Sequence, residues 1–125
     1  MTKDTKCECL GGSKLLFACS GAADVGKIAD LVARKLTADG VGKMFCLAGI
    51  GGRVDPIMKA TGEASEIVAI DGCTLDCVKK TLENAGFTDL IAVRVTDMGY
   101  EKGKSLATDA AVADVATKTR LRLEV

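Results

Sequence analysis

The stretch Lys14-Leu-Leu-Phe-Ala-Cys19, followed at once by Ser20-Gly-Ala-Ala-Asp-Val-Gly26, decides the fold of this chain. Its first part is an apolar run of strand length, and its second part is a glycine-containing turn. A strand that passes through such a turn into an amphipathic helix is the first half of a βαβ unit. The helix is indicated by apolar residues at three- and four-residue spacing, namely Val25, Ile28, Ala29, Val32 and Leu36.

Strand-like apolar runs return three more times along the chain, at residues 43–47, 66–70 and 90–95. A glycine-rich loop is expected at 48–52, followed by a short helix that begins near Pro56. Another helix should carry Leu75, Val78 and Leu82 on one face and end at Gly86. A polar loop at 100–105, a helix around 108–117 and an edge strand formed by an alternating tail (Leu121, Leu123, Val125) complete the expected elements.

Strands that alternate with helices predict an α/β fold with an open parallel sheet and helices on both faces. Right-handed connections favour the strand order 2-1-3-4, as in flavodoxin-like and Rossmann-like folds. A chain of 125 residues fits one domain. We expect a flexible leader over residues 1–13, with the Cys-x-Cys pair Cys7 and Cys9, and a single α/β metal-binding domain over residues 14–125, for the reasons given below.

Composition argues against several kinds of partner. The 17 Lys and Arg residues balance the 17 Asp and Glu residues, and aromatic residues are scarce, so nucleic acid is not expected as a partner. No signal-peptide pattern or long apolar run is present, which predicts a cytoplasmic protein without a membrane partner. Six cysteines in a short chain of a reducing compartment indicate metal ligation or thiol chemistry rather than disulfides.

The positions of the cysteines are informative. Cys19, Cys46 and Cys73 stand at or near the carboxyl ends of the first three strands, where α/β sheets bind their ligands. Cys77 follows Cys73 by four residues, in the first turn of the next helix. Any one cysteine could equally be a packing residue, but together they predict a four-thiolate site for zinc or another soft metal ion. The chain has no histidine to compete as a ligand.

Three stretches of the chain also carry a resemblance to a known family: residues 15–26, residues 42–53 and Ala69-Ile-Asp-Gly-Cys-Thr-Leu-Asp-Cys77. They resemble the DGC-domain family of zinc-binding proteins, named after the motif found here as Asp71-Gly72-Cys73. The resemblance spans residues 14–104 and implies zinc bound by four cysteines, which match Cys19, Cys46, Cys73 and Cys77. Thr74 stands where relatives often have proline, and its hydroxyl is expected to cap the following helix. No protein partner or reaction is implied.

Two other functions remain open from the sequence. Cys19 could be the nucleophile of a thiol enzyme that accepts a phosphoryl or sulfur group, although Val25 replaces the arginine that a low-molecular-weight phosphatase would need. Cys73 and Cys77 could instead form a redox pair. Because neither alternative gives all four strand-edge cysteines a task, binding is favoured over catalysis.

Overall fold

The computed structural model describes residues 13–123 of the chain. The first twelve residues, with Cys7 and Cys9 of the predicted leader, and the last two residues lie outside the described part. The expectations for the leader and for Val125 therefore stay predictions.

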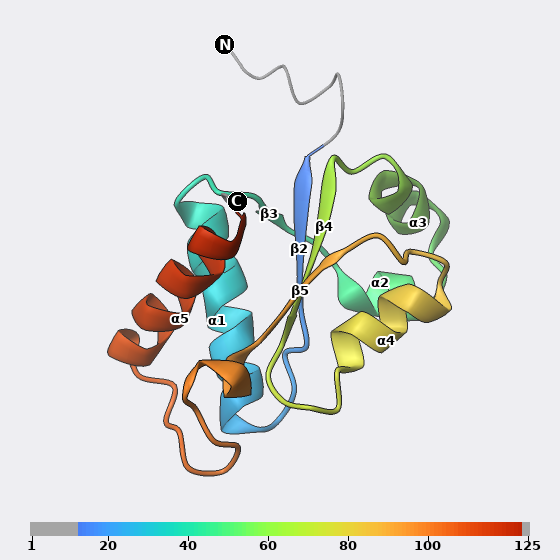
Figure 1. Cartoon of the computed structure of the whole chain (residues 1–125). Coiled ribbons are helices and arrows are strands. Elements are labelled where there is room, and N and C mark those ends of the chain that lie inside the picture. Colours follow the sequence, from blue (N-terminus) through green and yellow to red (C-terminus); the bar gives the residue numbers. More distant parts are fainter. Residues whose placement is uncertain (1–12, 124–125) are drawn as a thin grey trace.

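Four parallel strands form the sheet, in the order β3-β2-β4-β5. They are β2 (Lys14–Ala18), β3 (Lys43–Met44), β4 (Glu66–Asp71) and β5 (Ile91–Arg94). In order along the chain this is 2-1-3-4, which confirms both the predicted topology and the α/β class. All four strands run in one direction, so their carboxyl ends meet at the same edge of the sheet, the lower edge in Figure 1.

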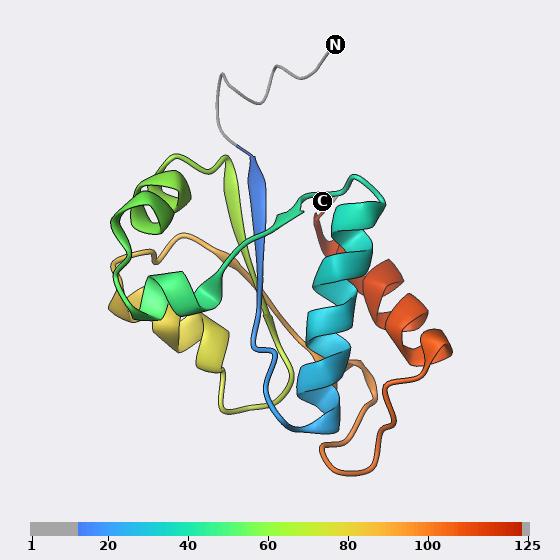
Figure 2. The same cartoon turned by 180° about the vertical axis from the view of Figure 1, so that it is seen from behind.

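Helices cover both faces of the sheet. On one face lie α1 (Asp24–Ala38) and α5 (Asp109–Leu123), and on the other lie α2 (Leu47–Gly51), α3 (Asp55–Gly62) and α4 (Cys77–Asn84), as Figures 1 and 2 show. A short 3-10 helix, η2 (Val95–Met98), follows β5. Within residues 13–123 no helix has the length and apolar character needed to cross a membrane.

The alternation of side chains along the strands divides the core into two layers. Leu16 and its neighbour Val68 on β4 face α1, whereas Phe17 and its neighbour Ala69 face α4. All four are fully buried. Because both faces are covered, the strands are nearly continuously apolar, which made them easy to recognise in the sequence.

Three local expectations were wrong. Residues 48–52 are not a glycine-rich loop, since Leu47–Gly51 form α2, and Leu75 is 57% exposed rather than part of the buried face of α4. Leu121 and Leu123 belong to the last turns of α5 and not to an edge strand. Packing of α5 against α1 explains this last difference, because the buried residues of α5 follow helical spacing: Val112, Val115, Ala116, Thr119 and Leu123.

Candidate metal centre

Three of the four predicted ligands line one cavity at the carboxyl edge of the sheet. This cavity, called here the cysteine cavity, has a volume of about 390 Å³ and is bordered by Cys19, Cys73 and Cys77. Its remaining walls are apolar or glycine residues, with one charged side chain, Lys102. The structure places all three at the carboxyl edge of the sheet: Cys19 directly follows β2, Cys73 lies in the turn after β4, and Cys77 is the first residue of α4.

The Asp71-Gly72-Cys73 turn is held in place at each of its first two residues. The carboxylate of Asp71 accepts hydrogen bonds from the backbone N–H groups of Val78 (2.8 Å) and Lys79 (3.1 Å), so it caps α4. Burial raises the pKa of this carboxyl group, and the two N–H donors act in the opposite direction. Asp71 thus takes the capping role that was expected of Thr74, and it is a structural residue of the turn.

Gly72 lies directly against the first turn of α1. A Cβ atom at this position would come within 2.8 Å of the backbone carbon of Val25 and 2.9 Å of the backbone nitrogen of Gly26. Only glycine allows this approach, and the approach brings Cys73 to the wall of the cavity that Cys19 also lines.

A salt bridge fixes the end of the same turn. Asp76 has a left-handed backbone (φ 54°), and its carboxylate receives two hydrogen bonds from the Arg94 guanidinium, at 3.0 and 2.8 Å. Arg94 also contacts Asp97 at 3.2 Å. The hydrogen bonds from Arg94 hold the pKa of Asp76 below its ordinary value. This pairing ties the residue before Cys77 to the end of β5.

The loop between η2 and α5 reaches the cysteine cavity through Lys102. The Asp24 carboxylate accepts hydrogen bonds from the backbone N–H groups of Gly103 and Ser105, both at 2.9 Å. Between these anchors and the cavity, Lys102 places its Nζ atom 3.7 Å from the Sγ atom of Cys73. The sequence did not indicate Lys102 and Asp24. Asp24 is separated from its partners Gly103 and Ser105 by 79 and 81 positions, and no local motif connects residues so far apart.

We expect Asp24→Ala to release this loop. Without the carboxylate acceptor, the amides of Gly103 and Ser105 should exchange hydrogen several-fold faster, whereas Asp109→Ala, at the start of α5, should leave them unchanged. The hydrogen bonds from Gly103 and Ser105 lower the pKa of Asp24. The stabilisation is therefore complete above the ordinary aspartate pKa of about 3.9 and is lost as the pH falls through the lower folded value. Amide exchange and an acid titration followed by NMR test both statements.

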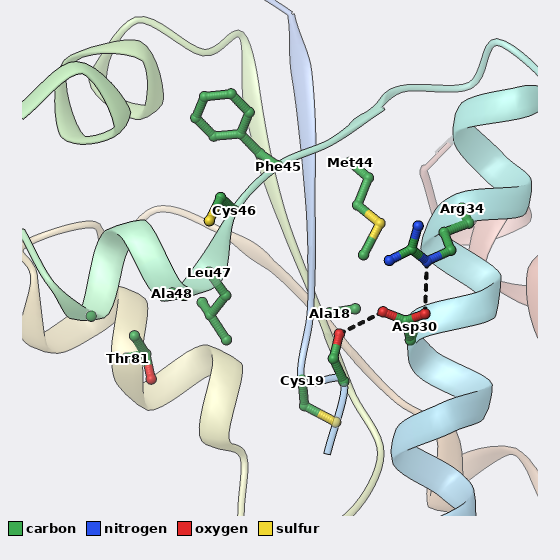
Figure 3. A pocket seen from close by; sticks show the side chains of 12 residues that line it. Ala18, Cys19, Asp30, Arg34, Met44, Phe45, Cys46, Leu47, Ala48 and Thr81 are labelled. Atoms are coloured by element: carbon green, nitrogen blue, oxygen red, sulfur yellow. Dashed lines mark hydrogen bonds and ion pairs between the residues drawn. The ribbon is translucent and has the colours of Figure 1, made fainter. Parts of the chain in front are cut away.

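Cys46 lies elsewhere, on a second cavity of about 570 Å³ that shares Cys19 with the first. Its Sγ atom accepts a hydrogen bond from the backbone N–H of Gly49 (3.3 Å) at the start of α2. In Figure 3 the sulfur atoms of Cys19 and Cys46 do not point toward one another. On the opposite wall, Asp30 accepts hydrogen bonds from Ser20 (2.7 Å) and Arg34 (2.8 Å), and these are the dashed lines of Figure 3.

The short β3 strand explains the position of Cys46. Met44, its last residue, pairs with Leu16, so β3 stops before the level at which β2 ends in Ala18. Phe45 donates one more backbone hydrogen bond, to Leu16, and then the chain turns into α2. Cys46 therefore becomes the N-terminal cap of α2 and not the end of a full-length strand.

The four cysteines are chemically suited to a soft metal ion, because thiolates are the ligands preferred by zinc and copper(I). The positions of the sulfur atoms, however, differ from the expected convergence on one point. Within residues 13–123, no group of three or more cysteine or carboxylate side chains lies close enough together to hold a metal ion. Three predicted ligands share a cavity and the fourth lines the adjoining one, so the ligand set stays a prediction.

Comparison with known proteins identifies a family to which the chain is similar. The family model described as DGC domain matches residues 15–119. The chain is also 32% identical over 88 residues to the anaerobic and virulence modulator AnvM of Pseudomonas aeruginosa, an overlap that covers 70% of this chain and 67% of that protein. No solved structure matches the chain significantly. The matched region contains Cys19, Cys46, Cys73 and Cys77.

Proposed function

Since the chain belongs to the DGC-domain family, we propose that it is a small cytoplasmic protein that binds a soft metal ion through cysteine thiolates. Zinc is the first candidate for this metal. The ligands in this proposal are those that the sequence indicated, namely Cys19, Cys46, Cys73 and Cys77. The observation that carries it is the cysteine cavity, where three thiols from separate elements line about 390 Å³ of space. A soft metal bound there would act as a crosslink between these elements.

Cys46 would have to move to join such a site. It sits on the wall of the adjoining cavity, which shares Cys19, and the interaction of its sulfur with the Gly49 N–H is a weak one. α2, which Cys46 caps, has only five residues, but Arg53 fastens its end by donating to the carbonyl oxygens of Ile50 (2.7 Å) and Asn84 (3.1 Å). We therefore expect the N-terminal end of α2 and the Cys46 side chain to move on binding while the Arg53 end stays in place.

The lining of the cysteine cavity supports binding rather than hydrolysis. It contains no carboxylate and no hydroxyl group that could activate water, and Lys102 is its one charged residue among those described. The similar protein AnvM is named a modulator, which agrees with a binding role. When bound, zinc would supply positive charge and fixed geometry to the thiolates.

Cobalt substitution tests this proposal. Metal-free protein titrated with Co²⁺ is expected to develop an intense thiolate-to-metal absorption band and the visible spectrum of a tetrahedral centre at one equivalent. Zinc should then displace cobalt and remove the band, because tetrathiolate sites prefer zinc. A spectrum of octahedral cobalt without a charge-transfer band at saturation would contradict the proposal.

A further inference from the structure

Lys102 is placed on the cysteine cavity by a long-range contact that the metal proposal does not use. Its ammonium group lies 3.7 Å from the Cys73 sulfur, and the neighbouring backbone is fastened to the start of α1 by the Asp24 carboxylate. Lys104, two residues on, instead forms an ion pair with the carboxylate of Glu101, in the same loop, at 3.8 Å. The fold thus directs one positive charge at one sulfur atom.

The composition of the cavity restricts what this sulfur can react with. Around Cys73 the walls are formed by Ala22, Ala23, Val25 and Leu75, with two further thiols, Cys19 and Cys77. A phosphoryl group carries two charges and needs several donors, and this lining offers a single cationic side chain. A sulfane sulfur atom is soft, apolar and carries at most one charge when bound as a persulfide. The cavity therefore suits sulfur chemistry better than phosphate chemistry.

From these observations we propose that Cys73 of the metal-free protein takes up sulfane sulfur from a low-molecular-weight hydropersulfide. The Cys73 thiolate attacks the outer sulfur of R–S–SH, a new S–S bond forms at Cys73, and the S–S bond of the donor breaks. The donor leaves as R–S⁻ and takes up the proton of the outer sulfur, so the products are Cys73–S–S⁻ and R–SH. No oxidant or reductant is consumed. Lys102 stands where the negative charge of the bound persulfide would lie.

Transfer onward is the same exchange in reverse, with a different thiol as the acceptor. This makes the protein a sulfur carrier and gives it a second activity at the cysteine cavity. The activity needs neither Cys46 nor a metal ion, so it can hold or fail independently of the zinc proposal. Bound metal would occupy Cys73 and block it.

Mass spectrometry of the metal-free, full-length protein in the presence of EDTA tests the inference. With L-cysteine hydropersulfide as the donor, intact protein should gain about 32 Da, and peptide mapping should place the added sulfur on Cys73. Lys102→Met should slow this uptake by about fivefold, the effect of removing one unit charge at close range. Lys102→Arg should restore most of the rate, and Lys104→Met, which removes the same charge from the same loop, should react as the unaltered protein does.

Two results would overturn the inference. One is sulfur spread evenly over the cysteines or collected mainly on Cys46, since the Lys102 ammonium group contacts the sulfur atom of Cys73. The other is an equal rate of uptake in Lys102→Met and in the unaltered protein, both shown to be folded by circular dichroism. Cobalt binding is measured separately, so a protein that takes up sulfur but binds no cobalt would reject the metal proposal alone.

Discussion

Replacing Cys73 with serine is expected to weaken zinc retention by more than about a hundredfold, since the loss of a group that only supports a metal ligand already costs about 10- to 100-fold. The melting temperature of the zinc-loaded protein should fall with it, because binding free energy at a site absent from the unfolded chain is also folding free energy. The proposal predicts the same combined loss for each of the other ligands, which are Cys19, Cys46 and Cys77.

The control for this series is the double variant Cys7→Ser/Cys9→Ser, which removes the two thiols that precede the matched family region. It should keep one equivalent of zinc and an unchanged melting temperature, both measured by metal analysis after gel filtration and by thermal denaturation. A variant series in which only Cys19→Ser changes behaviour would favour the alternative of a reactive Cys19. Zinc loss in the double variant would show that the proposed set of four ligands is wrong.

The pattern of the results for Cys46 is the most informative part of the series. In the structure this residue lies on the cavity next to the other three cysteines. If Cys46→Ser keeps zinc while the other variants lose it, the site is formed by three cysteines and an outside ligand. If it loses zinc as the others do, the N-terminal end of α2 moves on binding.

The sequence predicted the sheet well for a physical reason. Strands covered on both faces are apolar along their whole length, so β2 and β4 stood out as runs such as Leu15 to Ala18 and Ile67 to Ile70. Right-handed connections then left few possible strand orders. The end of the chain was misassigned because Leu121 and Leu123 alternate as in a strand, whereas the contact of α5 with α1 decides for a helix.

The candidate site was predictable only in part. Strand ends place Cys19 and Cys73 at one edge because all four strands are parallel, and that follows from the chain pattern alone. The early end of β3, which places Cys46 on a different cavity, depends on how β3 pairs with β2. This pairing cannot be recognised from the apolar run at residues 43–47 alone. Lys102 contacts Cys73 from a loop that is held by Asp24, and such a long-range contact cannot be predicted from the local spacing of residues.

The second large effect is expected for Gly72→Ala, which should destabilise the protein by about 3 kcal/mol. The added methyl group would lie 2.8 Å from the backbone carbon and 2.9 Å from the backbone oxygen of Val25. Backbone atoms in a helical turn cannot rotate away as a side chain can, so the turn after β4 must shift from α1 as a whole. Thermal denaturation should show a melting temperature lower by roughly 10 °C.

Gly51→Ala is the matched control, because a Cβ atom at Gly51 meets no other atom within 4 Å and the residue lies in α2. This variant should be neutral or slightly stabilised, as expected for alanine in place of glycine in a helix. If Gly72→Ala were as stable as the control, the contact with α1 would not be what requires glycine in the Asp71-Gly72-Cys73 turn. If Gly72→Ala instead loses stability and metal binding together, the contact between this turn and α1 both stabilises the fold and positions Cys73 beside Cys19.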